Sequence, residues 1–222
     1  MKYELYEADC FEQLKCLKDK SIDITFTSPP YNRKRNDKYT NYDDTIDDYY
    51  VFLVNITDIL LTKTKRHIII NLQTNYYNKQ DVYKFIGHYY NKIQNVIIWE
   101  KKNPLPASGH SITNAFEYFF ILGDTPIKSN TTYTKNHITT TINNGITNIH
   151  KAVMKQEVSD WFIEKFTKEN DVVLDCFMGL GTTGLSCIKY NRDFIGIEID
   201  EKYFKIAEER INDIKLDLSD LD

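Results

Sequence analysis

The feature that most constrains the fold is an apolar run that turns through three glycines into a segment with helical spacing. Val172–Cys176 has the composition of a buried strand, and Leu185–Tyr190 has that of a helix. Between them the glycines stand in the spacing G-x-G-x-x-G, at Gly179, Gly181 and Gly184. Glycine is required where a strand turns tightly into a helix and a ligand approaches the backbone, because a Cβ would obstruct both. The run therefore predicts a strand, a ligand-binding turn and a helix.

Similar apolar runs recur along the chain and mostly alternate with helical patterns. They lie at Ile22–Phe26, His67–Asn71, Val96–Trp99, Tyr118–Leu122 and Phe194–Ile199. Apolar residues trace single helical faces in segments 82–89, 158–166 and 204–214. Because the runs carry few interior charges, they suit a sheet covered by helices on both faces. We expect a single α/β domain over residues 1–222, with the polar stretch 124–149 as an insertion or loop.

Composition excludes several classes of protein. With 41% hydrophobic and 27% charged residues, the 222-residue chain is typical of a globular protein. Four cysteines without a CxxC pattern and five scattered histidines predict neither a disulfide scaffold nor a metal site. No apolar run reaches the length of a membrane span, and acids occupy the N-terminal segment where an export signal would be apolar. We expect a cytoplasmic protein.

The net charge of −4 hides an uneven distribution. Six lysines stand against two acids between Lys101 and Lys155, and Arg33–Lys38 carries a second basic cluster. Such clusters are usually solvated loops, so their meaning depends on the motifs beside them.

The glycine turn leaves three cofactors open. Glu198 ends the next strand, about twenty residues on, where it can accept hydrogen bonds from two ribose hydroxyls. NAD, a flavin or S-adenosylmethionine would each fit this pattern. The position of the motif near the C-terminal end of the sequence favours the methyl donor. Thr182, Thr183 and the Asp175 carboxylate favour it as well, because they suit a zwitterionic methionine tail better than a pyrophosphate.

A second motif follows the first long apolar run. Ser28-Pro29-Pro30-Tyr31 ends that run abruptly, and prolines make a rigid turn that supplies carbonyls without competing N–H donors. The Ser28 hydroxyl and the Pro29 carbonyl can then point at one amino group, and Tyr31 offers a flat face.

These motifs together resemble the exocyclic-amino DNA methyltransferases in their β-type permuted order. The resemblance rests on Thr27–Asn32 and Asp175–Thr183, with further similarity at Glu7–Leu14, Ile98–Asn103 and Arg192–Glu198, so it spans nearly the whole chain. Cys176 departs from it, because the family commonly has proline there. The resemblance implies a Rossmann-like S-adenosylmethionine-dependent methyltransferase fold with a mostly parallel sheet, and makes the stretch 124–149 a short target-recognition insert.

The resemblance also implies a chemistry and the residues that perform it. An exocyclic amine of cytosine or adenine is a poor nucleophile until two acceptors favour its pyramidal form, and the base must first be flipped out of the duplex. The implied catalytic residues are Ser28, Pro29, Pro30 and Tyr31. The implied cofactor-binding residues are Asp9, Cys10, Asp175, Phe177, Gly179, Gly181, Thr182, Thr183 and Glu198.

Serine before Pro-Pro-Tyr favours cytosine N4 slightly over adenine N6 by resemblance. An RNA or protein methyltransferase, a nucleotide-cofactor oxidoreductase and a catalytically silent DNA-binding module are the remaining alternatives. Double-stranded DNA is the expected partner, with a homodimer and a cognate restriction endonuclease as further partners. The predicted phosphate contacts are Arg33, Lys34, Arg35, Lys101, Lys102, Lys128 and Lys135. The paired tyrosines, such as Tyr76 and Tyr77, are interpreted as packing residues.

Overall fold

An eight-stranded sheet forms the centre of the computed structural model, which describes residues 1–33, 45–104, 112–141 and 153–219. The strands are β1 (Tyr3–Glu7), β2 (Ile22–Thr27), β3 (Thr64–Leu72), β4 (Ile93–Lys101), β5 (Phe116–Gly123), β6 (His137–Thr140), β7 (Val172–Asp175) and β8 (Asp193–Glu198). Their order across the sheet is β1-β8-β7-β2-β3-β5-β4-β6. The helices are α1 (Cys10–Cys16), α2 (Tyr49–Lys63), α3 (Lys79–His88), α4 (Gln156–Phe166), α5 (Thr182–Lys189) and α6 (Glu201–Ser219). None of the helices in these ranges is long and apolar enough to span a membrane.

The sheet is mostly parallel, which confirms the expected α/β class. Only β5 runs against its neighbours β3 and β4, while every other described pair is parallel. β6 lies inside the stretch 124–149, which the sequence analysis assigned to an insertion or loop. It is a short strand at the sheet edge, and the Trp99 indole fixes it by donating a 2.8 Å hydrogen bond to the Thr140 hydroxyl.

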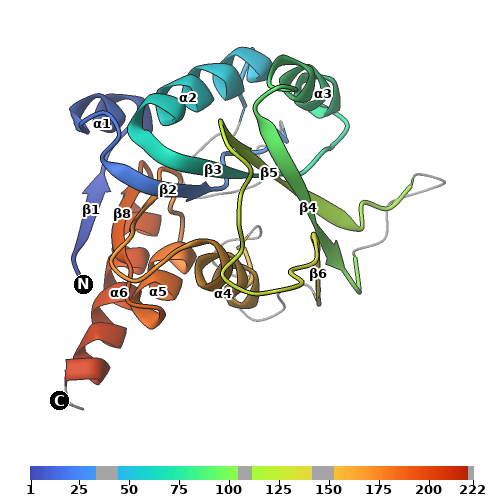
Figure 1. Cartoon of the computed structure of the whole chain (residues 1–222). Helices are drawn as coiled ribbons and strands as arrows, with labels where there is room; N and C mark the ends of the chain where they lie inside the picture. The colour runs from blue at the N-terminus through green and yellow to red at the C-terminus, as the bar shows by residue number, and fades with distance from the viewer. Residues whose placement is uncertain (34–44, 105–111, 142–152, 220–222) are drawn as a thin grey trace.

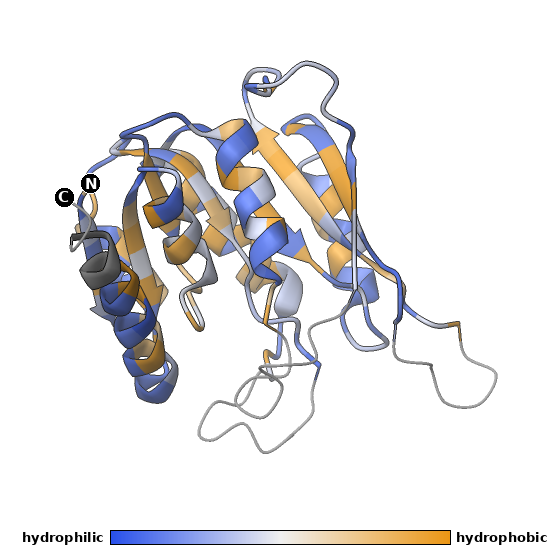
Figure 2. Cartoon of the chain, turned by 90° about the horizontal axis from the view of Figure 1, so that it is seen from below, coloured by the Kyte–Doolittle hydropathy of each residue, from blue (hydrophilic) through white to orange (hydrophobic). Residues whose placement is uncertain are grey.

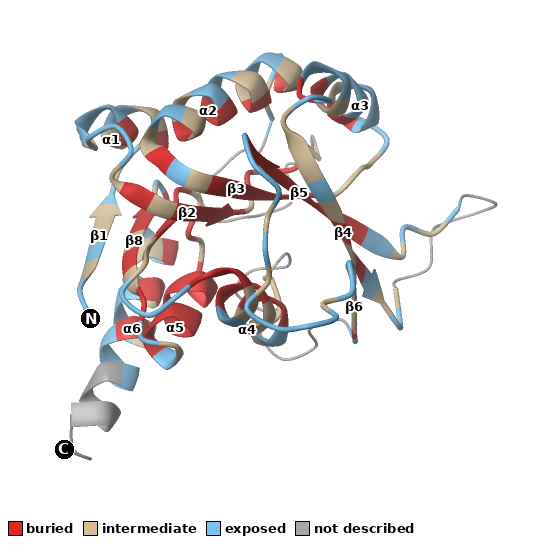
Figure 3. Cartoon of the chain, in the orientation of Figure 1, coloured by how far each residue is buried: buried red, intermediate tan, exposed pale blue. Residues whose placement is uncertain are grey.

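Three helices cover each face of the sheet, as Figure 1 shows, with α1, α2 and α3 above it and α4, α5 and α6 below. The upper core packs Leu53 and Leu60 of α2 and Phe85 of α3 onto the strands. The lower core packs the rings of Phe119 and Phe162 against each other in a tilted arrangement, with centroids 4.3 Å apart. The central strands are mostly buried and the outward helix faces are largely polar (Figures 2 and 3). This two-sided burial matches the pattern of uncharged strand runs.

The chain reverses its winding between β2 and β7. From β7 it crosses through α5 to β8 on one side, and from β2 it crosses through α2 to β3 on the other side. β2 and β7 are parallel neighbours, with Ile24 beside Val173 and Thr25 beside Leu174. Crevices for ligands form beyond the carboxyl ends of strands at such a switch point. The two sequence motifs therefore meet at the edge of the sheet formed by the carboxyl ends of β2 and β7.

The third glycine of the turn allows α5 to pack closely. A Cβ placed on Gly184 would lie 2.7 Å from Ile211 Cδ1 of α6 and 2.8 Å from the Phe194 ring of β8. Gly87, on the exposed side of α3, has no atom within 4 Å of such a Cβ. Packing therefore requires glycine at position 184, but not at position 87.

We expect Gly184→Ala to lower the free energy of unfolding, because overpacking costs about 1–3 kcal/mol and outweighs the better helix propensity of alanine. Gly87→Ala is the matched control and should raise it by about 0.5–1 kcal/mol. Urea unfolding curves followed by circular dichroism measure both. Shifts of the two midpoints in the same direction would contradict this account of the packing.

Candidate active site

A buried hydrogen-bond link joins the two motifs across the switch point. The Thr27 hydroxyl, at the end of β2, donates a 2.7 Å hydrogen bond to Asp175 Oδ1 at the end of β7. The Thr183 hydroxyl donates a 2.6 Å hydrogen bond to Asp175 Oδ2. Burial raises the pKa of Asp175, and the two hydroxyl donors oppose this rise. The carboxylate thus holds β2, β7 and the start of α5 at fixed positions.

This placement differs from the role that the sequence predicted for Asp175. The carboxylate was expected to face the ammonium group of a methionine tail. Both of its oxygens instead accept hydrogen bonds from hydroxyls inside the protein, and the residue is buried. Asp175 therefore stabilises the glycine turn from the protein interior.

The glycine turn adopts the backbone conformation that its sequence predicts. Gly179 and Gly181 have φ angles of 55° and 77°, in the left-handed region that favours glycine. The Gly179 N–H donates a 2.7 Å hydrogen bond to Glu198 Oε2, and the Asp200 N–H donates a 2.9 Å bond to Oε1. Burial raises the pKa of Glu198, although both backbone donors oppose it. A Cβ placed on Gly179 would meet no atom within 4 Å, so this side of the turn is open to a ligand.

The tip of β1, which leads into Asp9 and Cys10, lies beside Glu198. The Ala8 N–H donates a 3.0 Å hydrogen bond to the Glu198 carbonyl, and Asp9 caps α1 by accepting from two backbone N–H groups. Burial is the main cause that raises the pKa of Cys10 to about 12, so its thiol stays protonated. Phe177 packs against the Phe52 ring at a centroid distance of 6.0 Å.

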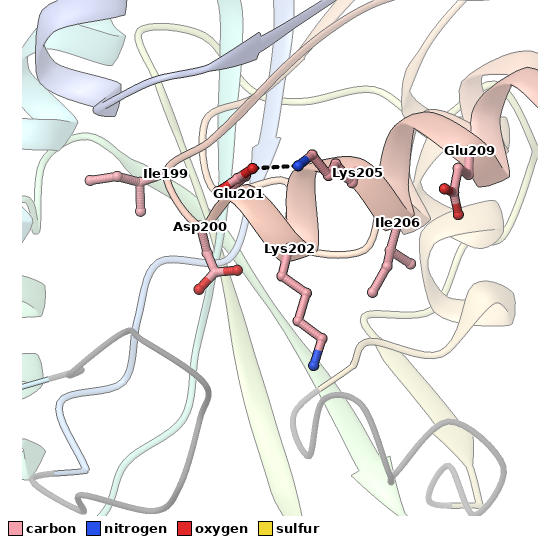
Figure 4. Close-up of a pocket in the computed structure, with 7 residues that line it drawn as sticks. All are labelled: Ile199, Asp200, Glu201, Lys202, Lys205, Ile206 and Glu209. Carbon is pink, nitrogen blue, oxygen red and sulfur yellow. Dashed lines mark hydrogen bonds and ion pairs between the residues drawn. The ribbon is translucent and has the colours of Figure 1, made fainter.

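A shallow hollow adjoins the tip of β8 on the side of α6 (Figure 4). An ion pair between Glu201 and Lys205 crosses the first turn of the helix. The exposed Ile199 side chain follows Glu198 directly and offers an apolar surface there. The lining residues are Ile199, Asp200, Glu201, Lys202, Lys205, Ile206 and Glu209.

On the other side of the switch point, the Ser28 and Tyr31 hydroxyls form a buried polar cluster. Their oxygens are 3.0 Å apart, and the single Tyr31 Oη proton is shared between Asn71 Oδ1 at 2.6 Å and Glu117 Oε2 at 3.0 Å. Burial, together with the charge of Glu117, raises the pKa of Tyr31 well above its usual range. The tyrosine hydroxyl therefore stays protonated and acts as a donor.

The Tyr31 ring is not the exposed stacking face that the sequence predicted. It is 8% exposed, and the Arg33 guanidinium lies 5.5 Å from its centroid. Arg33 Nη2 also donates a 2.8 Å hydrogen bond to Gln73 Oε1, which holds the guanidinium over the ring.

The backbone of this turn is fixed on both sides of Pro29. The Tyr49 hydroxyl donates a 2.8 Å hydrogen bond to the Pro30 carbonyl. The Asn75 and Asn78 side chains donate to the Tyr31 carbonyl at 2.8 and 2.7 Å. Within the described part of the chain, no hydrogen bond to the Pro29 carbonyl is seen. That carbonyl is thus held in place without being used by the fold.

The predicted phosphate contacts are distributed unevenly over the molecule. Lys101 forms a buried ion pair with Glu117, so the prediction that it contacts phosphate is wrong. Lys102 is exposed at the same sheet edge as Ser28. Lys128 follows the end of β5 and, because β5 is antiparallel to β3, lies at the opposite edge. Lys135 is exposed just before β6, and Lys34 and Arg35 lie outside the described residues.

Sequence reasoning missed several polar residues of the site, among them Asn71 and Glu117. Asn71 is the next-to-last residue of β3, and Glu117 is the second residue of the antiparallel β5, so both lie at the same end of the sheet as Ser28. Each flanks or ends an apolar run in the sequence. Polar residues at run ends are a signal for this edge, but only once the strand order and direction are known.

Comparisons with known proteins find a matching family and similar proteins. A family model described as DNA methylase, N6_N4_Mtase, matches residues 22–209. The type II methyltransferase M.HinfI of Haemophilus influenzae is 28% identical over 98% of this chain and 70% of its own length. The type II methyltransferase M.MwoI of Methanothermobacter wolfeii is 30% identical over 97% of this chain but only 36% of its own length.

Solved structures share the fold. The PvuII DNA methyltransferase, which is titled cytosine-N4-specific, is 19% identical with a TM-score of 0.78 and covers 96% of this chain and 91% of its own. The structure titled M1.HpyAVI-SAM complex is 24% identical with a TM-score of 0.66, and covers 94% of this chain and 99% of its own.

We expect Thr27→Val to lower the free energy of unfolding by about 1–3 kcal/mol at neutral pH, because a buried carboxylate loses a donor. The loss of that donor raises the folded-state pKa of Asp175 further and penalises only its charged form. The penalty should therefore shrink as pH falls through this raised pKa. Urea unfolding across a pH series measures it.

Thr25→Val is the matched control in the same strand. Its hydroxyl lies 2.7 Å from the buried Thr64 hydroxyl, so this substitution removes a hydrogen bond between neutral groups. Its cost should not depend on pH in the acid range. Equal pH dependence of the two variants would refute the assigned role of the Thr27–Asp175 bond.

Proposed function

The chain belongs to the DNA methylase family and is an S-adenosylmethionine-dependent DNA amino-methyltransferase; on this premise we propose that it methylates cytosine N4 on a base flipped out of duplex DNA. The observation that carries the proposal is the hydrogen bond between Thr27 and Asp175. It brings the Ser-Pro-Pro-Tyr turn and the glycine turn to one crevice, so that an acceptor pair for an amine stands beside a site for the methyl donor.

The residues of the glycine turn fit S-adenosylmethionine. Each Glu198 oxygen accepts one backbone N–H and keeps a second lone pair, so the carboxylate can accept from both ribose hydroxyls. The open side of Gly179 admits a ligand close to the backbone, and Ile199 offers an apolar surface. When bound, the cofactor supplies a methyl group on a sulfonium. We place Asp9, Cys10, Phe177, Gly181 and Thr182 around it, while Asp175 and Thr183, which are hydrogen-bonded to each other, support the turn from inside the protein.

Ser28 and Pro29 supply the acceptors for the target amine. The Pro29 carbonyl lies on a turn whose neighbouring carbonyls are held by Tyr49, Asn75 and Asn78. Two fixed acceptors favour the pyramidal amine, whose lone pair is free, and stabilise the positive charge that develops on its nitrogen. No covalent intermediate with the protein is needed.

The base and DNA backbone are proposed to displace Arg33 from Tyr31. A flipped base can stack on the tyrosine ring only if the guanidinium leaves it, and a phosphate beside the base gives the arginine a stronger partner than Gln73. Lys102 lies at the same edge, and Lys34 and Arg35 remain predicted contacts on the adjoining segment. A second copy of this chain and a restriction endonuclease remain predicted partners, and the stretch 124–149 a predicted target-recognition insert.

Methylation-sensitive long-read sequencing of DNA from cells that express the chain tests the function. We expect N4-methylcytosine within one short sequence motif, and N6-methyladenine would overturn the choice of base. The choice of cytosine is supported by resemblance alone, because Ser28 stands before Pro-Pro-Tyr where adenine-N6 enzymes more often have aspartate or asparagine. Unmodified DNA would overturn the proposed function.

Ser28→Ala should reduce turnover about 100-fold or more, because one of two preorganised acceptors is lost. The affinity for S-adenosylmethionine, measured by isothermal titration, should stay nearly unchanged. Equal losses of turnover and cofactor affinity would indicate misfolding, and unchanged turnover would remove Ser28 from the chemistry.

Arg33→Ala should weaken DNA binding and reduce the slope of log K against log salt by about 0.9, the contribution of one phosphate contact. Lys128→Ala, at the opposite edge of the sheet, is the matched control and should leave the slope unchanged. Fluorescence anisotropy with a labelled duplex over a salt series measures both. An unchanged slope in Arg33→Ala would contradict the assignment.

A further inference from the structure

A buried ion pair lies next to the Ser28–Tyr31 cluster, on the side of the crevice proposed for the target base. Lys101 ends β4, Glu117 lies near the start of β5, and the register pairs Trp99 with Glu117. Their side chains are 15% and 6% exposed, and among the described ion pairs no other has both partners so deeply buried. The Lys101 ammonium also lies 5.1 Å from the Trp99 ring centroid. Burying two charges is costly unless geometry and further hydrogen bonds compensate, so the use of the second Glu117 oxygen is informative.

That second oxygen faces the catalytic turn. Glu117 Oε2 lies 3.0 Å from the Tyr31 hydroxyl and shares its proton with Asn71 Oδ1, which lies 2.6 Å away, while Glu117 Oε1 pairs with Lys101. The Asn71 side chain is fixed in its orientation, because its Nδ2 donates a 3.1 Å bond to the Tyr118 carbonyl. Its Oδ1 must therefore face Tyr31 and Ser28 as an acceptor. The cluster around the two hydroxyls consists of a carboxylate oxygen and an amide oxygen, neither of which carries a proton.

Counting protons fixes the direction of the Ser28 hydroxyl. Tyr31 has one proton, and it is drawn to Glu117 Oε2 and Asn71 Oδ1. No donor in the cluster is left to point at Ser28. Its own proton therefore points inward, to Asn71 Oδ1 at 3.2 Å or to the Tyr31 oxygen at 3.0 Å. The remaining lone pairs of Ser28 Oγ face the crevice, which is the polarity that accepting a hydrogen bond from an amine requires.

We infer that the Lys101–Glu117 pair is a positioning device that sets the proton direction of Ser28 through Tyr31 and so presents an acceptor to the target amine. The inference rests on the proposed function and adds two residues to it. Glu117 touches no reacting atom and acts through Tyr31. Lys101, which the charge pattern had assigned to phosphate, holds the Glu117 carboxylate in the acceptor role.

A double-mutant cycle tests the inference, with a duplex carrying the sequence motif found by sequencing as substrate. Glu117→Gln keeps the shape of the side chain but places an amide donor in a cluster that needs acceptors. We expect kcat to fall about tenfold or more, with the KM for DNA and the affinity for S-adenosylmethionine within about twofold of the wild-type values. In the Ser28→Ala background the same substitution should cause no further loss, because the hydroxyl it acts on is absent.

Glu100→Gln is the matched control. Glu100 is the neighbour of Lys101 in β4, its side chain is 48% exposed, and it contacts His137 and Thr139 rather than the cluster. It should retain wild-type kcat. Tyr31→Phe, which breaks the link between Glu117 and Ser28, should likewise abolish the additional effect of Glu117→Gln.

The outcomes separate the inference from the proposed function. A wild-type chain that methylates no DNA overturns both. A wild-type chain that methylates DNA, with a loss from Glu117→Gln that is as large in Ser28→Ala as in the wild type, overturns only the positioning role. Unchanged kcat in Glu117→Gln, or a parallel loss of cofactor affinity, also overturns it.

Discussion

The Asp175 carboxylate is the constraint on which the rest of the crevice depends. A buried carboxylate is costly to ionise, and this one is stabilised by hydroxyls from two different elements and by the Phe177 N–H. Thr27 belongs to the strand that leads to Ser28, and Thr183 belongs to the helix that follows the glycine turn. The hydrogen bonds to the buried Asp175 carboxylate therefore fix the relative positions of the Ser-Pro-Pro-Tyr turn and the glycine turn, which are almost 150 residues apart in the chain.

Much of the fold could be predicted from apolar periodicity, and the missed elements have physical reasons. The central strands carry few charges in their interiors because they are buried on both faces, whereas β1 carries exposed acids at Glu4 and Glu7 and does not stand out from its sequence. α2 has apolar residues on several sides, from Val51 to Leu61, so no single face marks it as a helix. β6 is short, polar and at an edge, and it depends on Trp99, a contact that no local pattern encodes.

The backbone turns of the candidate site could be predicted where residue type alone determines the local conformation. Glycines in left-handed conformations and the proline turn could be recognised from residue type alone. The role of Lys101 could not, because a lysine beside a buried acid and a lysine facing a phosphate look alike in sequence. Lys128 belongs to the same charge cluster as Lys102, yet the antiparallel direction of β5 places it at the far edge. Tertiary pairing and strand direction decide both cases.

The two halves of the crevice use different kinds of group, and this affects how they respond to change. The cofactor half is built largely from backbone, with the Gly179 N–H and the Asp200 N–H on one carboxylate. The base half relies more on side chains, with Ser28, Asn71 and Glu117 beside the Pro29 carbonyl. Apart from the glycines at positive φ, backbone donors depend little on side-chain identity, whereas a proton network changes with each member. On the proposed function, substitutions in the base half should therefore alter the amine chemistry and leave the donor site intact. Thr27, through its hydrogen bond to Asp175, connects the two halves.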